Sequence, residues 1–74
     1  MAYQKNAKIE ELLNLVYEAE NGRGYPVIKM MADYLSTGDP SYITTAGSAR
    51  SRIMNQDSAE IIAELLKVYF GKER

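Results

Sequence analysis

The residue types that most often carry catalysis or bind metals are scarce in this sequence. It contains neither histidine nor cysteine, so the commonest general base, the thiolate nucleophile and the usual transition-metal ligands are missing. Its carboxylates do not fall at the spacing of an acid–base dyad or a calcium-binding loop; they include Asp33, Asp39, Asp57, Glu60 and Glu64. We therefore predict no catalytic, cofactor-binding or metal-binding residue, and a protein that is not an enzyme.

Two arginines, Arg50 and Arg52, are candidates for ion pairs or for contacts with a partner protein. On a helix they lie roughly 200° apart, so they do not form one basic patch. Arg50 falls inside an apolar stripe and needs a partner, because an unpaired buried charge is costly. Asp39 or an acid from another helix or subunit would supply it. Arg52 is expected to face solvent, where a partner protein can reach it.

Hydroxyl side chains gather around the start of the same helix. Thr44 and Thr45 are placed to cap it, and Ser48 and Ser51 suit its polar side. All four are also candidate phosphoacceptors, with Thr44 and Thr45 foremost, because a phosphate near Thr44 would lie at a helix N-terminus, where negative charge is stabilised. Capping is the favoured interpretation, since ordinary residue preferences suffice for it, and modification is the alternative.

A sharp corner in the middle of the chain must position these residues. Gly38 can take a positive φ and end one helix, while Asp39 can cap the next and Pro40 suits its first position. Residues 40–43 then form a single helical turn, with Tyr42 packed over the corner. The alternative is that Gly38, Asp39, Pro40 and Tyr42 dock a partner, although a turn alone explains these residue types.

Helical periodicity accounts for the rest of the chain, and no alternating pattern of useful length indicates a strand. Asn6 caps the first helix and Gly22 is expected just beyond its end, while Asp57 and Glu60 form a capping box for the last helix, which stops at Gly71. The four helices are expected at about residues 6–20, 26–36, 45–55 and 57–70. The fold class is therefore all-α, a compact bundle of four main helices plus one short helical turn.

The apolar faces of these helices are wide for so small a protein. With 74 residues and 46% apolar residues, the sequence predicts one globular domain over 1–74, ordered at about 6–70. Three of the helices show apolar arcs of roughly 200°, nearly twice what a surface helix of a monomer needs. We therefore predict an intertwined or side-by-side homodimer that buries the excess. The alternative is a monomer with exposed apolar flanks.

Charge and hydropathy limit the other partners. The net charge of −1 gives no general attraction to nucleic acid or anionic lipid, and no apolar run approaches membrane-spanning length. The absence of cysteine and of a secretion signal favours the cytoplasm. The competing function is a helix-turn-helix module with Arg50 and Arg52 in the major groove of DNA. The net negative charge of the chain and the placement of the two arginines on opposite sides of their helix argue against it.

Several segments match, in order and spacing, those of a known family. They are Val16-Tyr17-Glu18-Ala19, Gly24-Tyr25, Tyr34-Leu35, the corner from Gly38 to Thr44, Ala49-Arg50, Ile53 and Glu60 to Leu66. Over about residues 9–70, without a gap, the sequence thereby resembles the IreB/ReoM family of small cytosolic regulators. Gly38, Asp39, Pro40 and Tyr42 match the signature turn of that family, and Arg50 matches its Ala-Arg pair.

The resemblance implies an all-helical homodimer without enzymatic activity, placed under a membrane Ser/Thr kinase with PASTA domains. It also implies partners in cell-wall synthesis or proteolysis, because such regulators adjust peptidoglycan synthesis in part through turnover of an early cell-wall enzyme. This sequence departs from the family in having no Ser or Thr before Ser36, so no threonine of the family's phosphorylated tail carries over. Pro26 also follows Tyr25 directly, and residues 55–59 lack the family's basic character.

Overall fold

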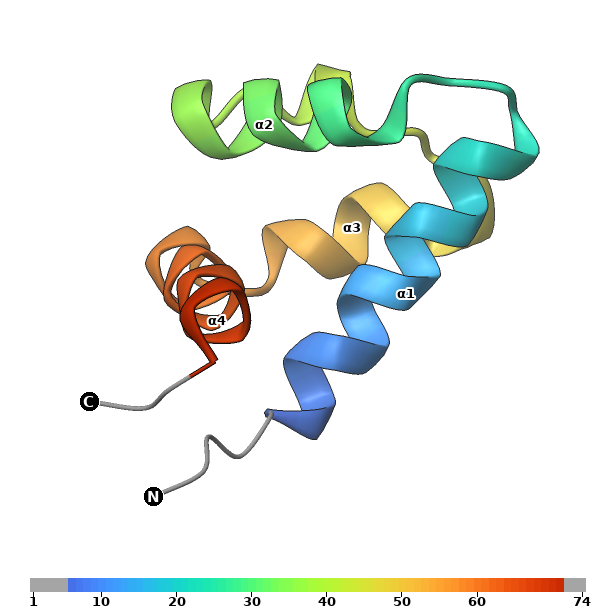
Figure 1. Ribbon diagram of the computed structural model, residues 1–74. Coiled ribbons are helices and arrows are strands. Elements are labelled where there is room, and N and C mark those ends of the chain that lie inside the picture. The colour runs from blue at the N-terminus through green and yellow to red at the C-terminus, as the bar shows by residue number, and fades with distance from the viewer. Residues whose placement is uncertain (1–5, 72–74) are drawn as a thin grey trace.

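The computed structural model describes residues 6–71, and every regular element in that part of the chain is helical (Figure 1). The elements in order are α1 (Ala7–Gly22), α2 (Val27–Thr37), the 3₁₀ turns η1 (Pro40–Tyr42) and η2 (Ala46–Ser48), α3 (Ala49–Met54) and α4 (Ser58–Phe70). The predicted all-α class with four main helices is confirmed. The structure adds a second short turn, η2, to the one that was predicted.

Helix α1 begins where its sequence predicts and ends later. The Asn6 side chain accepts hydrogen bonds from the backbone N–H groups of Lys8 and Ile9, at 3.1 and 3.3 Å, as an N-cap does. The prediction that Gly22 lies beyond the end of the helix is wrong, because Gly22 is its last residue. Gly24, with φ of +74°, makes the turn instead.

The central corner forms as predicted. Gly38 ends α2 in the left-handed region, with φ of 76°, and its N–H donates to the Tyr34 carbonyl at 2.7 Å. The Asp39 side chain then accepts from the Ser41 N–H at 3.0 Å, and Pro40 opens η1. The chain therefore reverses from α2 toward α3 within a few residues.

The single helix predicted at about residues 45–55 is wrong. Gly47 and Ser48 both adopt left-handed backbone conformations, with φ of 59° and 63°, and they separate η2 from the short helix α3. Ser48 carries the strain that a non-glycine residue has at such angles. After this break, Ala49 and Ile53 on α3 are fully buried, so the break sets a direction for α3 that closes the core.

The last helix is capped by Asp57, whose side chain accepts from the Ala59 N–H at 2.9 Å, and Gly71 ends it with φ of 70°. The predicted capping box is only half formed. The Glu60 carboxylate accepts from the Gln56 side-chain amide at 2.6 Å instead of closing the box.

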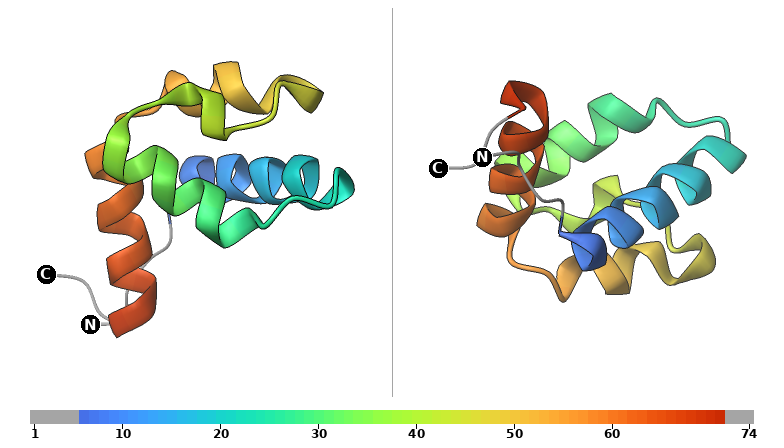
Figure 2. Two further views of the ribbon diagram at one scale, coloured as in Figure 1. Left: turned by 90° about the horizontal axis from the view of Figure 1, so that it is seen from above. Right: turned by 60° about the horizontal axis from the view of Figure 1, so that its bottom comes forward.

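One core joins α1, α2, α3 and the start of α4. Its buried members are Leu12, Val16, Tyr34, Ile43, Ala49, Ile53 and Ile61. Figure 2 shows that α1, α2 and α3 lie together while α4 projects away from them. Only Ile61 and Glu64 are buried on α4. No helix within residues 6–71 is both long and apolar enough to cross a bilayer.

Candidate functional site

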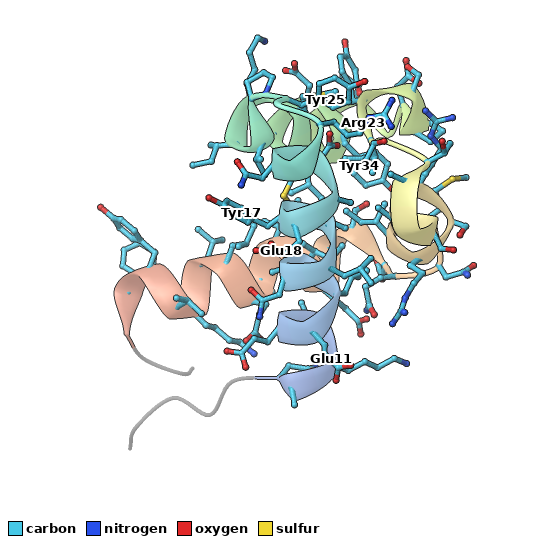
Figure 3. All side chains as sticks on the ribbon, turned by 90° about the vertical axis from the view of Figure 1, so that its right-hand side faces the viewer. Glu11, Tyr17, Glu18, Arg23, Tyr25 and Tyr34 are labelled. Carbon is cyan, nitrogen blue, oxygen red and sulfur yellow. The ribbon has the colours of Figure 1, made fainter. Side chains whose placement is uncertain are left out.

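The projecting helix α4 carries six of the ten large hydrophobic side chains that are exposed within residues 6–71. We call the surface that these six form the α4 face, and they are Ile62, Leu65, Leu66, Val68, Tyr69 and Phe70. Tyr69 and Phe70 are 82% and 62% exposed, and their rings pack edge to face at 5.2 Å between centroids. Figure 3 shows that Tyr17, which is also exposed, extends from α1 on the side where α4 lies. Exposed large apolar side chains grouped on one helix make it a candidate for a protein–protein contact.

The corner residues are held in place by local hydrogen bonds. Asp39 is exposed, and the backbone and side chain of Ser41 donate hydrogen bonds that hold the pKa of its carboxyl below the ordinary value, with attraction from Arg50 as a smaller cause. Tyr42 is half-buried and packs against the core. The structure thus brings the corner close to the arginine on α3.

Arg50 is half-buried and reaches back to the corner. Its Nε donates to the Ile43 carbonyl at 2.7 Å, which ties α3 to the fully buried Ile43. Within residues 6–71 its guanidinium forms no ion pair, and Asp39 acts on it through a longer-range attraction. Its two terminal nitrogens therefore have room for a further acceptor.

Arg50 also lines a hollow of about 300 Å³ at the start of α3. The other residues around this hollow are Thr45, Ser48, Ser51 and Met54. The hollow combines one guanidinium with three hydroxyls, which are groups that hydrogen-bond an anion. We call it the Thr45 hollow.

The two candidate phosphoacceptors occupy different environments. The Thr44 hydroxyl accepts from the Ala46 N–H at 3.2 Å, and the Thr44 N–H donates to the Glu20 carboxylate at 3.2 Å. Thr45 is exposed, and its hydroxyl makes no hydrogen bond with any residue of the described part of the chain. Sequence reasoning treated the two threonines alike, whereas the structure distinguishes them.

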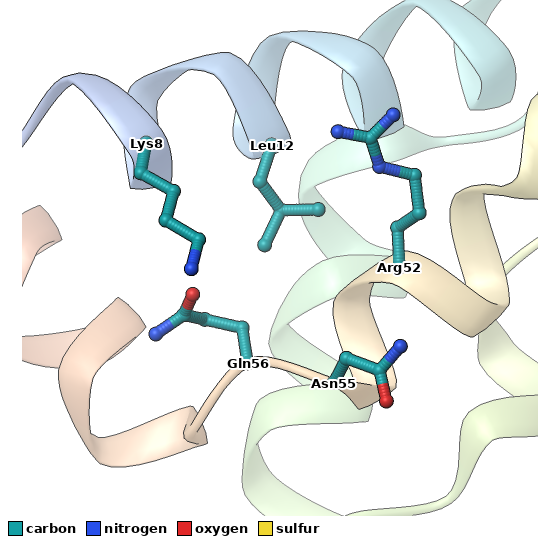
Figure 4. Close-up of a pocket in the computed structure, with 5 residues that line it drawn as sticks. All are labelled: Lys8, Leu12, Arg52, Asn55 and Gln56. Carbon is teal, nitrogen blue, oxygen red and sulfur yellow. The ribbon is translucent and has the colours of Figure 1, made fainter.

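Arg52 lies away from Arg50, as the helical spacing predicts. It is exposed and lines a separate hollow of about 190 Å³ with Lys8, Leu12, Asn55 and Gln56. In Figure 4, Lys8 extends from α1 toward the Gln56 amide, and Arg52 extends from α3 toward α1 beside Leu12. Neither cation forms an ion pair within residues 6–71. Sequence reasoning missed Lys8, because Lys8 and Arg52 lie far apart in the sequence and only the fold brings them to the same hollow.

Two buried glutamates were also missed. The Glu20 side chain is fully buried; one carboxylate oxygen accepts from the Thr44 N–H, and the other has no hydrogen-bond partner among residues 6–71. Glu64 is nearly buried and accepts from the Asn6 N–H at 3.0 Å, which fastens α4 to the start of α1. The signal for Glu20 was its place one turn beyond Val16 on the buried side of α1.

Residues 6–71 contain no group of three or more histidine, cysteine, aspartate or glutamate side chains that could bind a metal ion.

The features that remain are the α4 face, the corner and two hollows with arginines, and all of these suit contacts with other proteins. The family model described as IreB regulatory phosphoprotein matches residues 1–71 of the sequence. With nearly the whole chain matched, the protein belongs to the IreB family.

Proposed function

We propose that this protein is a non-enzymatic regulator that acts through protein–protein contacts as a homodimer. The observation that carries the proposal is the α4 face, which a single chain leaves open to water. At about 200 Å² for an aromatic side chain, Tyr69 and Phe70 together expose about 300 Å² of mostly apolar surface. A stable interface buries about 800 Å² on each partner, so these two residues alone would supply a large part of it.

A second copy of this chain is the occupant that best fits the α4 face. A two-fold axis places one apolar patch against the same patch on its partner, so no other protein with a complementary surface is needed. Because α4 projects from the other helices (Figure 2), we propose that the α4 helices of two copies pack along each other. The dimer would be side by side if α4 stays packed against the core of its own chain, and intertwined if α4 packs against the core of the partner chain instead.

The family description supports a regulatory, phosphorylated protein, and the finer context proposed below rests on the resemblance. We propose that a membrane Ser/Thr kinase with PASTA domains phosphorylates this cytoplasmic protein, and that it adjusts peptidoglycan synthesis or the proteolysis of a cell-wall enzyme. The corner at Gly38, Asp39, Pro40 and Tyr42 is the proposed rim contact for one partner. The hollow of Lys8 and Arg52 offers two cations that form no ion pair with any of residues 6–71, which suits acidic groups on a partner.

The helix-turn-helix alternative gains no support from the arrangement of the arginines. Arg50 and Arg52 line separate hollows, and Arg50 is tied to the Ile43 carbonyl. Binding along a DNA backbone needs clustered cations. A gel-shift assay at low salt checks this point, and a stable complex with duplex DNA would revive the alternative.

Light scattering and a pull-down test the proposal together. We expect a mass near twice that of one 8.3 kDa chain at tens of micromolar protein. We also expect specific capture of a PASTA-domain kinase or of cell-wall synthesis or proteolysis proteins from a cell extract. A well-folded monomer that captures none of these classes would refute the proposed function.

A further inference from the structure

We infer that Thr45 is the phosphoacceptor of the folded part of this chain and that Arg50 receives the phosphate. The inference rests on the proposed function, which takes the protein to be a kinase substrate. It goes further by choosing one hydroxyl and naming the group that would respond to its modification.

The environments of the hydroxyls single out Thr45. Most Ser and Thr side chains in residues 36–58 already make local hydrogen bonds: Ser36 and Thr37 to the Asp33 carbonyl, Ser41 to Asp39, Thr44 to the Ala46 N–H, and Ser51 to the Ser48 carbonyl. Thr45 is exposed, lies outside the α-helices and has no such bond. A kinase must bring the hydroxyl up to the γ-phosphate of ATP, so an exposed and unengaged hydroxyl is the one that can react.

Two other hydroxyls, those of Ser48 and Ser58, also lack a hydrogen-bond partner within residues 6–71 but are placed less well. Ser48 adopts a left-handed backbone between Gly47 and the fully buried Ala49, so a kinase cannot extend the chain there without disturbing the core. Ser58 is half-buried at the first position of α4. Thr45 instead precedes the left-handed break at Gly47 and Ser48, and its own backbone has ordinary right-handed angles, with φ of −82° and ψ of −8°.

The Thr45 hollow already contains a receiver for the phosphate. Arg50 lines the same hollow, and only its Nε is engaged, with the Ile43 carbonyl. A phosphothreonine carries about two negative charges near pH 7 and forms strong charge-assisted hydrogen bonds with a guanidinium. The nearby acids are Asp39, which attracts Arg50 from the corner, and Glu20, whose buried carboxylate holds the Thr44 N–H.

The reaction is a phosphoryl transfer from ATP. The Thr45 hydroxyl oxygen forms a bond to the γ-phosphorus, the bond from that phosphorus to the bridging oxygen of ADP breaks, and ADP leaves with the electron pair. The hydroxyl proton passes to a base on the kinase. The new phosphate competes with Asp39 and the Ile43 carbonyl for Arg50. We expect the change to centre on residues 43–51 and to leave the α4 face intact.

The experiment treats the full chain with Mg-ATP and the catalytic domain of a PASTA-domain Ser/Thr kinase. Intact-mass and fragment spectra then locate the phosphate. We expect one phosphoryl group on Thr45, its loss in Thr45→Ala, and its retention in Thr45→Ser and in the control Ser36→Ala. In ¹⁵N-labelled protein, the Arg50 Nε–H resonance should shift on phosphorylation, while the side-chain N–H of Arg52 should not.

The outcomes separate this inference from the proposed function. Phosphate on a different residue would overturn the inference while supporting the protein as a kinase substrate. No phosphate at all would also overturn it, and the dimer mass and the pull-down would then judge the proposed function on their own. Phosphorylation of Thr45 without any change at Arg50 would overturn the assigned receiver. Spectra of the unmodified variants establish that each one is folded.

Discussion

Tyr69 offers the sharpest perturbation of the proposed dimer. Its side chain is 82% exposed in the single chain, and its ring packs edge to face against that of Phe70. Tyr69→Ala should therefore leave the fold of one chain nearly unchanged. Any large effect of this substitution must come from surface that another molecule covers.

The size of the effect follows from the exposed area. At about 200 Å² for an aromatic side chain, Tyr69 offers about 160 Å² for burial. At about 25 cal/mol per Å², full burial corresponds to about 4 kcal/mol per protomer as an upper bound. Alanine keeps part of this area and the tyrosine hydroxyl is polar, so we take half of the upper bound, about 2 kcal/mol per protomer. The loss for the two protomers of a dimer is then about 4 kcal/mol. The dissociation constant should then rise by about a thousandfold.

Sedimentation or light scattering over a dilution series measures this change. Ile28→Ala is the matched control, because Ile28 is 83% exposed but belongs to α2 and not to the α4 face. We expect the control to dimerise like the unaltered protein. The reasoning would be refuted if Tyr69→Ala dimerised as tightly as the unaltered protein, or if the control weakened the dimer equally.

Three further predictions concern the fold and the corner. Glu64→Ala should lower the free energy of unfolding by about 2 kcal/mol in urea denaturation, because the Asn6 N–H loses a charged acceptor, whereas Glu64→Gln should lose less. Ser48→Gly should raise the thermal midpoint through a gain of about 0.5–1 kcal/mol, since glycine relieves the left-handed strain but adds freedom to the unfolded chain. Hydrogen bonds from Ser41 lower the pKa of Asp39, so the ionised carboxylate stabilises the fold above about pH 3.8. This contribution is lost as the pH falls through the lower pKa of the folded state. In Asp39→Asn, the free energy of unfolding should therefore fall less steeply as the pH is lowered.

Each of these predictions has a matched control. Glu18→Ala removes an exposed glutamate from α1 and should change the free energy of unfolding little, so an equal loss would contradict the role of Glu64. Ser51→Gly places glycine inside α3 and should destabilise it, opposite in sign to Ser48→Gly. For Asp39→Asn, an unchanged acid limb between about pH 2 and pH 6 would contradict its assigned titration.

Local signals in the sequence predicted the parts of the fold that depend on neighbouring residues. The caps at Asn6, Asp39 and Asp57 and the glycine stops at Gly38 and Gly71 form as predicted, because each involves hydrogen bonds or backbone angles within a few residues. Broad apolar arcs were also informative. The excess on α4 is left exposed by the single chain.

Features that depend on distant segments could not be predicted. The break at Ser48 costs local strain that is offset by burial of Ala49 and Ile53, and no residue preference signals a left-handed serine. Glu20 is buried because it meets Thr44, which lies 24 residues away in the sequence. Helical spacing correctly separated Arg50 from Arg52, but the hollow that Arg52 lines depends on how α3 packs against α1, and the Thr45 hollow that Arg50 lines depends on the break between η2 and α3.

Contacts between two copies of the chain test the central claim most directly. A sample that mixes isotope-labelled and unlabelled protein allows filtered nuclear Overhauser spectra to report only contacts between chains. We predict contacts between chains from Leu65, Leu66, Tyr69 and Phe70 to the same side chains of the partner. A sample whose spectra showed no contacts between chains, with a mass of one 8.3 kDa chain at the same concentration, would contradict the account.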